Sequence, residues 1–426
     1  MSTTPPAPPP APVAGPTRVP AIDAYRGFVM FLMLAEVLRL PAVARQFPDS
    51  PFWQAVLFHT THVEWVGCSL HDLIQPSFSF LVGVAMVFSL AARKARGEPF
   101  WKSALHAGWR SVALVALGVI LRSVGDGHKR TNFTFEDTLS QIGMGYFLLF
   151  LIGQLKPRWW WVALGVILVG YWAAFLAYPP PGPDFEFEKV GVSAKWAEEH
   201  HDSFSGLAAH WKKNSNLAWA ADTWFLNLFP RASEFKFNGG GYATASFIPT
   251  LGTMILGLIA GGWLRRAESA WRQVLWLAAA GAVGLAAGRV LGDFGVCPVV
   301  KRIWTPSWVL FSGGWCFLIL AVFHALTAGI GYAGWTYPLR VIGANSILIY
   351  VIAEVPLGGW LLTQLQKHLP ADTFPTVGKW LAGWADRAED VKVVEAVSKV
   401  AKGAVLLAVY WLFLWWLYVK RVFVRI

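Results

Sequence analysis

Three histidines and an aspartate stand close together near the start of an apolar segment. His59, His62 and His71 fall within thirteen residues of one another, and Asp72 follows directly. A histidine with a carboxylate neighbour can be tuned to act as a general base or a nucleophile near neutral pH. An ionisable group inside a bilayer costs about 2.5–3.5 kcal/mol on insertion scales, so an intramembrane aspartate points to a partner or a function. This cluster is therefore the first candidate for a reactive site.

Two more ionisable residues flank the first apolar segment. Arg26, in the stretch DAYRG, stands at its start and either meets an anion or anchors the helix at the cytoplasmic face. Glu36 lies near its other end and either takes part in the site or pairs with Arg39, one turn on.

A third polar group occurs in the stretch IGANSILIYVIAE, which begins at residue 342. Ser346, Tyr350 and Glu354 recur at every fourth position and share one stripe of a helix, whereas Asn345 is rotated away. Such a stripe either lines a site or supplies hydrogen bonds between helices.

Aromatic, amide and charged residues are dense in the long polar stretch 179–243. Tryptophan faces beside amide and charged groups suit a sugar-binding site. The alternative is a folded cap with aromatic anchors at the membrane surface. The candidate acceptor-binding residues are Asn216, Asp222, Trp224, Asn227, Arg231 and Asn238.

The composition places these residues in a membrane protein. Of the 426 residues, 55% are hydrophobic and only 14% are charged, whereas soluble domains carry roughly 25% charged residues. A spanning helix needs about 20 mostly apolar residues. We therefore predict an all-α, polytopic bundle of about ten transmembrane helices. The apolar segments are 24–41, 70–92, 105–123, 138–155, 159–178, 244–264, 272–291, 307–328, 336–357 and 403–420.

The basic residues predict the orientation of the bundle. With ten spans, the four short basic loops fall on one side together with both termini, and the positive-inside rule makes that side cytoplasmic. The net charge of +11 thus indicates topology rather than nucleic-acid binding. We expect a multi-pass protein of the inner (plasma) membrane with the stretch 179–243 outside. The basic loops are 92–102, 156–158, 264–273 and 419–426.

The remaining segments complete the predicted organisation. Residues 1–21 are rich in Pro and Ala and predict a disordered cytoplasmic tail, so residues 22–426 form one transmembrane domain. The amphipathic segment 381–403 is predicted to lie on the outer surface. The three cysteines lack metal-ligand spacing, so no metal is expected, and a disulfide between Cys68 and Cys297 is left open.

The stretches DAYRG and HVEWVGCSLHDLIQPSF resemble the heparan-α-glucosaminide N-acetyltransferase family of transmembrane acetyltransferases. The similarity continues over 247–261, 296–314 and 342–355, and so covers nearly the whole membrane core. The resemblance implies an acyltransferase that delivers acetyl groups from cytosolic acetyl-CoA to the amino group of a glucosamine on the far side of the membrane.

The resemblance also implies roles for particular residues. The family's catalytic histidine precedes a Trp-x-Gly pattern and an intramembrane aspartate, which places His62 and Asp72 in those roles. A family amide near the outer end of the first span has no clean equivalent, since Val37 occupies that position and Glu36 lies beside it. The stretch 179–243 also differs from the lysosomal enzymes, so heparan itself is not the expected acceptor.

Acetyl-CoA is accordingly the expected co-substrate, with its nucleotide at the basic cytoplasmic face and its pantetheine arm inside the bundle. The expected acceptor is an amino sugar or, alternatively, a sugar hydroxyl. His62 would then deprotonate the acceptor amine or carry the acetyl group transiently, with Asp72 and Glu36 as its catalytic neighbours. The candidate donor-binding residues are Arg26, Arg93, Lys94, Arg96, Asn345 and Ser346.

Two other classes of protein stay open. A transporter of a small molecule or lipid-linked sugar would also have charges at the membrane midplane, but it should show inverted repeats, and none is evident. A non-catalytic scaffold predicts neither a perturbed histidine nor a ligand-sized cavity. The expected partners are an amino-sugar or glycan acceptor and membrane lipid, with a homodimer as a further option and no nucleic acid.

Overall fold

The computed structural model describes residues 19–124, 130–200 and 204–424, and these residues fold into a bundle of helices. Within these ranges there is no β-strand beyond a single antiparallel bridge between Val66 and Val300. The predicted tail lies mostly outside the described residues. Its last two residues are instead helical, since the first helix begins at Pro20.

Four helices form the centre of the bundle, and glycines let them approach closely. A Cβ on Gly83 would lie 1.8 Å from the backbone oxygen of Met254, and one on Gly257 would lie 1.9 Å from that of Phe80. Small residues are the usual means of packing helices within a membrane, where apolar side chains gain little from leaving lipid. The central helices are α1 (Pro20–Leu34), α4 (Ile74–Ala95), α10 (Phe247–Leu264) and α12 (Pro306–His324).

Four further helices surround this centre and expose apolar side chains outwards. Trp109, Val166 and Val283 are each more than 60% exposed, as expected for side chains that face lipid. Two of these helices, α5 and α6, pack against each other, and α11 packs along α12. The surrounding helices are α5 (Phe100–Ser123), α6 (Thr138–Gly153), α7 (Pro157–Ala177) and α11 (Ala270–Asp293).

The prediction of an all-α polytopic membrane protein is confirmed, and all ten predicted segments fall on helices. Among the described residues, seven helices are long and apolar enough to cross a membrane, or eight if one bent pair is a single span. The other two segments coincide with α1 and α6, which have only 15 and 16 residues. The seven are His71–Ala95, Phe100–Ser123, Pro157–Ala177, Thr244–Leu264, Ala270–Asp293, Pro306–Gly329 and Val391–Val419.

The bent pair consists of Gly334–Gly343, which includes α13 (Tyr337–Gly343), and α14 (Ser346–Glu354), at an angle of 60°. Asn345 stands at the break and is buried. Its amide donates to the backbone oxygen of Val422 at 3.1 Å and accepts from the backbone nitrogen of Val424 at 2.8 Å. Asn345 therefore clamps the C-terminal segment onto the break.

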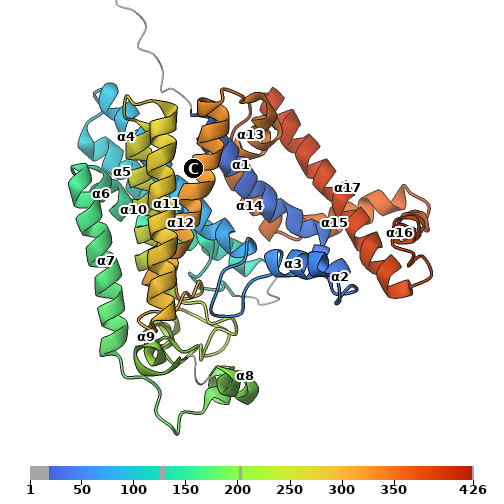
Figure 1. Cartoon of the computed structure of the whole chain (residues 1–426), viewed down its shortest axis with the longest axis horizontal. Coiled ribbons are helices and arrows are strands. Elements are labelled where there is room, and N and C mark those ends of the chain that lie inside the picture. Colours follow the sequence, from blue (N-terminus) through green and yellow to red (C-terminus); the bar gives the residue numbers. More distant parts are fainter. Residues whose placement is uncertain (1–18, 125–129, 201–203, 425–426) are drawn as a thin grey trace, which may run out of the picture.

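A group of helices projects from one side of the bundle (Figure 1). The amphipathic segment 381–403, predicted to lie on the outer surface, is divided between two of these helices. The first residues of that segment end α16, and Val391–Gly403 forms the start of α17. Asp390 caps α17, accepting from the backbone nitrogens of Lys392 and Val393, so the helix begins before the predicted span at 403. The projecting helices are α2 (Leu40–Ala44), α3 (Pro51–His59), α15 (Leu357–Lys367), α16 (Thr373–Gly383) and α17 (Val391–Val419).

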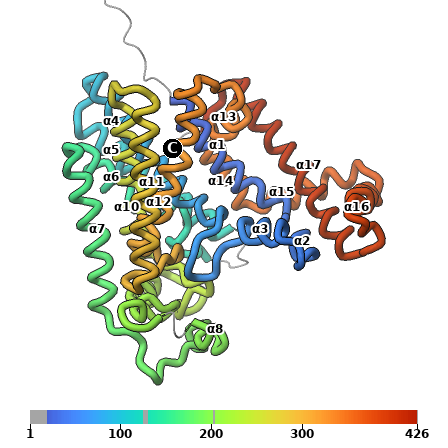
Figure 2. The backbone as a smooth tube through the Cα atoms, viewed as in Figure 1, coloured from blue at the N-terminus to red at the C-terminus, as the bar shows by residue number. Residues whose placement is uncertain are grey.

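The stretch 179–243 forms a cap at one end of the bundle, with α8 (Ala194–Glu199) and α9 (Leu217–Phe225) (Figure 2). It has its own hydrophobic cluster, in which Trp211 stacks on Phe175 with ring centroids 4.2 Å apart. Trp65 joins this cluster and donates from its indole nitrogen to the backbone oxygen of Trp211 at 3.2 Å. The segment that carries the histidines is thus fastened to the cap.

Candidate functional site

The segment between α3 and α4 is held in place at both of its ends. Where α3 ends, the Thr60 hydroxyl donates back to the oxygen of Val56 at 2.6 Å. Further on, Gly67 has a φ of +122°, which favours glycine, and its nitrogen donates to the oxygen of Val299 at 2.9 Å. This pairing lays the histidine segment alongside the residues that precede α12.

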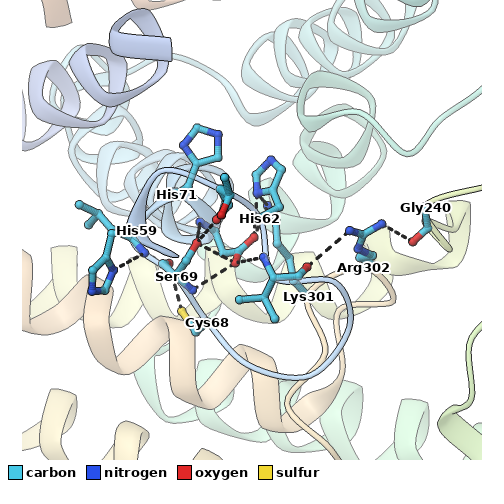
Figure 3. Close-up of polar contacts among 12 residues, drawn as sticks. His59, His62, Cys68, Ser69, His71, Gly240, Lys301 and Arg302 are labelled. Carbon is cyan, nitrogen blue, oxygen red and sulfur yellow. Dashed lines mark hydrogen bonds and ion pairs between the residues drawn. The ribbon is translucent and has the colours of Figure 1, made fainter. Parts of the chain in front are cut away.

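Asp72 organises the site, from the short 3₁₀ turn His71–Leu73 at the start of α4. Its Oδ2 accepts from the nitrogen of Val63 at 3.1 Å and from the nitrogen and hydroxyl of Ser69 at 3.1 and 3.0 Å. Its Oδ1 lies 2.8 Å from Nδ1 of His62 and 3.1 Å from Nζ of Lys301 (Figure 3). The carboxylate is only 2% exposed, so its charge is satisfied entirely by these groups.

These contacts decide which nitrogen of His62 is available for chemistry. Nδ1 of His62 lies 3.2 Å from the Lys301 ammonium, which carries only donors, and 2.8 Å from the Asp72 carboxylate, which carries only acceptors. The contact with the carboxylate is the shorter of the two, so we assign the proton to Nδ1, which then donates to Asp72 and leaves the lone pair on Nε2. The side chain is 42% exposed, so this lone pair is accessible. A carboxylate that fixes the tautomer of a histidine in this way is the arrangement of a general base or a nucleophile.

The surroundings also favour the neutral form of His62. Burial lowers the pKa of His62 below its usual value, and the positive charge of Lys301 lowers it further, against the opposing effect of Asp72. The imidazole is therefore uncharged at neutral pH, as a base or nucleophile requires.

The other two histidines of the segment have different partners. His71 lies with its ring centroid 4.5 Å from that of His62, and its Nε2 is 3.2 Å from the Glu36 carboxylate. Glu36 belongs to the 3₁₀ turn Ala35–Leu38 and pairs with His71 rather than with Arg39, the alternative to a role in the site. Nδ1 of His59 accepts from the nitrogen of Leu70 at 3.3 Å, and Figure 3 shows its ring apart from that of His62, beyond Ser69.

A cavity of about 640 Å³ opens between α1, α4, α5, α6 and α13. Its wall follows α4 from Arg93 inwards to Phe78, which is six residues from Asp72, on the order of 10 Å along the helix axis. The wall is apolar near Phe78, whereas other parts of it carry basic side chains among apolar ones, together with one carboxylate, Asp23. The basic residues that line it are Arg26, Arg93, His106, Arg110 and Arg340.

No family model matches the chain. The chain is similar to heparan-alpha-glucosaminide N-acetyltransferase of Homo sapiens, with 23% identity over 393 residues, 83% of this chain and 56% of that protein. It is equally similar to the enzyme of the same name from Mus musculus, at 23% identity over 393 residues, 82% of this chain and 56% of that protein. The chain is a distant relative of these two enzymes. It spans only about half of the length of these curated relatives.

This distant relationship confirms the resemblance that the motifs suggested. Three of the six predicted donor-binding residues lie at the cavity. Arg26, Arg93 and Ser346 line the cavity. Lys94 and Arg96 are exposed and do not line it, and Arg96 pairs with Glu98 at 3.6 Å. Asn345 does not line it either, since its amide is taken up by the C-terminal segment.

Four basic residues were not among the predicted site residues: His106, Arg110 and Arg340 line the cavity, and Lys301 contacts His62. Arg110 and Arg340 lie inside the predicted segments 105–123 and 336–357, and an arginine within a predicted span is itself a signal of function. Lys301 had a weaker signal. It falls inside the stretch 296–314, which resembles the acetyltransferase family, but no local sequence pattern pairs it with His62.

Most of the six predicted acceptor residues form hydrogen bonds with backbone groups in or beside the cap, and one is exposed on its surface. The Asn216 side chain caps α9, Asp222 accepts from the nitrogen of Thr244 at 2.8 Å, and Asn227 and Asn238 close turns of the backbone. Trp224 is 69% exposed, and Arg231 donates to the oxygen of Phe133 at 2.6 Å. These contacts stabilise a folded cap, and an acceptor role for the six residues stays a prediction.

The three cysteines are unpaired in the structure. Cys68 and Cys297 are free thiols in the structure, so the disulfide left open by the sequence is not formed. Among the described residues, no group of three or more His, Cys, Asp or Glu side chains is arranged to hold a metal ion.

Proposed function

We propose that this protein is a membrane acetyltransferase that transfers the acetyl group of cytosolic acetyl-CoA to an amino group of a sugar on the opposite side of the membrane. One observation carries the proposal. The His62–Asp72 pair, with an accessible Nε2, stands near the inner end of a cavity with a basic wall. Its distant relatives are named as N-acetyltransferases, which supports the same reaction class.

The cavity suits the chemistry of coenzyme A. Its arginines offer bidentate donors to phosphate oxygens, and Arg110 is held in place by the Tyr146 hydroxyl at 3.2 Å. The apolar wall near Phe78 and Leu81 suits the uncharged pantetheine arm. In this arrangement the phosphates stay at the basic end and the thioester reaches towards Asp72 and His62.

The reaction follows from the free lone pair of His62. The acceptor amine attacks the thioester carbonyl, forming the N–C bond as the C–S bond breaks, and Nε2 of His62 takes the proton that the amine loses. The leaving thiolate of coenzyme A takes up a proton and becomes the thiol. Asp72 holds the tautomer and stabilises the transient imidazolium, and the exposed His62 then releases its proton to water. Transfer through an acetyl-histidine needs the same neutral Nε2.

Glu36 has a separate role in this proposal. Its carboxylate is 55% exposed and is held by His71, whose ring lies against His62. A carboxylate at this position attracts the ammonium form of an amino sugar to the mouth of the site. The cap 179–243 would then surround the acceptor on the outer side, with both termini and the basic loops in the cytoplasm.

The experiment that tests this function incubates the purified protein with radiolabelled acetyl-CoA and a panel of amino sugars and neutral sugars. We expect label in an amino sugar, and none when the His62→Ala protein is used. Label in no acceptor, together with no binding of acetyl-CoA by the folded protein, would contradict the proposal. Uptake of sugar into liposomes without acetyl transfer would support the transporter class.

A further inference from the structure

We propose that Lys301 keeps His62 in its neutral form, as a positioning residue that neutralises the charge of Asp72. This inference rests on the proposed role of His62 as a base and goes beyond it by assigning the residue that sets its protonation state. Lys301 is 9% exposed, and its ammonium lies 3.1 Å from Oδ1 of Asp72 and 3.2 Å from Nδ1 of His62.

The positive charge of Lys301 changes how strongly Asp72 stabilises a protonated His62. A histidine next to a bare buried carboxylate gains stability as an imidazolium, because the two charges attract in a poorly hydrated site. Lys301 already supplies the positive charge that Asp72 attracts, so an imidazolium at His62 would gain little and would face a second cation. Asp72 therefore fixes the tautomer of His62 without making its ring a stable cation.

The other groups around His62 strengthen this reading. His71 stands on the same segment with its ring against that of His62, and Glu36 faces His71 from the turn after α1. Without Lys301, the carboxylates of Asp72 and Glu36 would face the two histidine rings with no ammonium group to balance the charge of Asp72. Protonation of His62 would then become more favourable.

The segment that carries Lys301 is rigid, which keeps the ammonium at this distance. The nitrogen of Val300 donates to the Thr305 hydroxyl at 3.0 Å, and Thr305 caps the start of α12. Arg302 donates to the oxygen of Gly240 at 2.5 Å and to that of Val63 at 3.4 Å, which ties this segment to the cap and to the residue after His62 (Figure 3). Lys301 is thus fixed against Asp72 by its backbone as well as by its charge.

The test uses Lys301→Gln, which keeps a donor for Asp72 but removes the charge. We expect the acid limb of the pH dependence of kcat/KM to move up by at least one pH unit. Activity should fall at pH 6, by no more than about tenfold for each pH unit by which the limb moves, and return to within about threefold of wild type at pH 9. Lys301→Arg, which keeps the charge, should keep the wild-type limb. A loss of the same factor at every pH would show a merely structural role and overturn the inference.

A second measurement reads His62 directly and does not need turnover. Diethyl pyrocarbonate modifies neutral imidazole, so its reaction at His62, followed by peptide mass spectrometry from pH 5 to 8, reports the protonation midpoint of that ring. We expect a higher midpoint in Lys301→Gln, or in Lys301→Met if the glutamine variant does not fold. Lys213→Met is the matched control, since Lys213 is a buried lysine of the cap that lies over Trp196.

The outcomes separate the two proposals. A shifted midpoint in a protein that transfers acetyl to no acceptor would support the role of Lys301 and count against the proposed function. An unchanged midpoint in folded Lys301 variants with normal turnover would overturn the role of Lys301 and leave the proposed function standing.

Discussion

His59 and His62 stand three positions apart, yet their ring nitrogens have different partners. Nδ1 of His59 accepts a backbone hydrogen bond, whereas Nδ1 of His62 donates to a buried carboxylate and leaves Nε2 open. The same side-chain chemistry thus serves structure in one case and is available for proton transfer in the other. Residue type alone does not separate the two, and the contact with Asp72 does.

This difference predicts the outcome of a matched pair of substitutions. His62→Ala should lower kcat for acetyl transfer by about 10²–10⁴-fold, the usual contribution of general acid–base catalysis, without weakening the binding of acetyl-CoA. His59→Ala should change kcat by less than about threefold. Stopped assays at saturating donor measure both. Near wild-type turnover in a folded His62→Ala protein would show that another group accepts the proton.

Much of this residue-scale picture could be predicted from the sequence, because His62 and Asp72 are only ten positions apart and share one local motif. Lys301 could not be paired with them, since 229 positions separate it from Asp72 and the two meet only through tertiary contacts, the packing of α12 against α4 and the backbone pairing of Gly67 with Val299. Glu36 was named as a candidate of the site, with a pair to Arg39 one turn on as the alternative. The chain instead folds His71 against it.

At the scale of the elements, α4 connects the two halves of the proposed reaction. Its start carries Asp72, and its last turn carries Arg93 on the wall of the basic cavity. Lys94 and Arg96 follow closely but do not line the cavity. Lys94 is one position on and so lies on another face of the helix, whereas Arg96 lies just beyond the end of α4 and pairs with Glu98. A run of basic residues predicts which end of a helix is basic and not which side chain lines a site.

The cavity predicts the effect of removing its arginines. Arg340→Gln should weaken acetyl-CoA binding by about tenfold or more, because a phosphate would lose a charge-assisted donor. Arg96→Gln removes an equal charge from an exposed position outside the cavity and should change the dissociation constant less than about twofold. Isothermal titration of both proteins with coenzyme A measures the difference. Equal effects would indicate that only the net charge of the face matters.

The cap carries a pH-dependent element of its own. Burial raises the pKa of Asp222 to about 6, so its protonated form is the one that the folded cap favours. The contribution of Asp222 to the free energy of unfolding is therefore fully present below about pH 4. It is lost as the pH rises through about 6, and the total loss is up to about 3 kcal/mol. Asp222→Asn keeps an oxygen for the nitrogen of Thr244 and removes this loss.

We therefore expect Asp222→Asn to raise the thermal stability of the purified protein at pH 7.5 and to leave it unchanged near pH 4. Differential scanning fluorimetry at the two pH values measures this. Asp390→Asn, which alters the half-buried cap of α17 instead, is the control. A lower melting temperature at pH 7.5 in Asp222→Asn would mean that the ionised carboxylate is the stabilising form.

The sequence could not distinguish a sugar site from a folded cap, and it did not locate the start of α17; both have a physical cause. The stretch 179–243 was expected to hold either a sugar site or a cap, and amides such as Asn227 suit both. In the structure Asn227 donates to the oxygens of Thr223 and Phe235, so it closes the cap's own backbone. The start of α17 was placed too late because its first turns are amphipathic, and the cap at Asp390 was not taken as a helix start.

At the scale of the whole molecule, the features of the site are arranged along the bundle. The cap and the histidine segment lie at one end, and Figures 1 and 2 show the start of α1 at the other end. The cavity follows α4 between these ends. This arrangement suits a protein that receives a charged donor on one side of the membrane and passes only an acetyl group to the other.

One measurement tests that central claim most directly. The protein is reconstituted in sealed liposomes and only the population with its basic loops outwards is followed, with an amino-sugar acceptor enclosed and radiolabelled acetyl-CoA added outside. We predict acetylated sugar inside the liposomes, no label inside with His62→Ala, and no coenzyme A inside in either case. Acetylation that requires acetyl-CoA and the acceptor on the same side of the membrane would contradict the account.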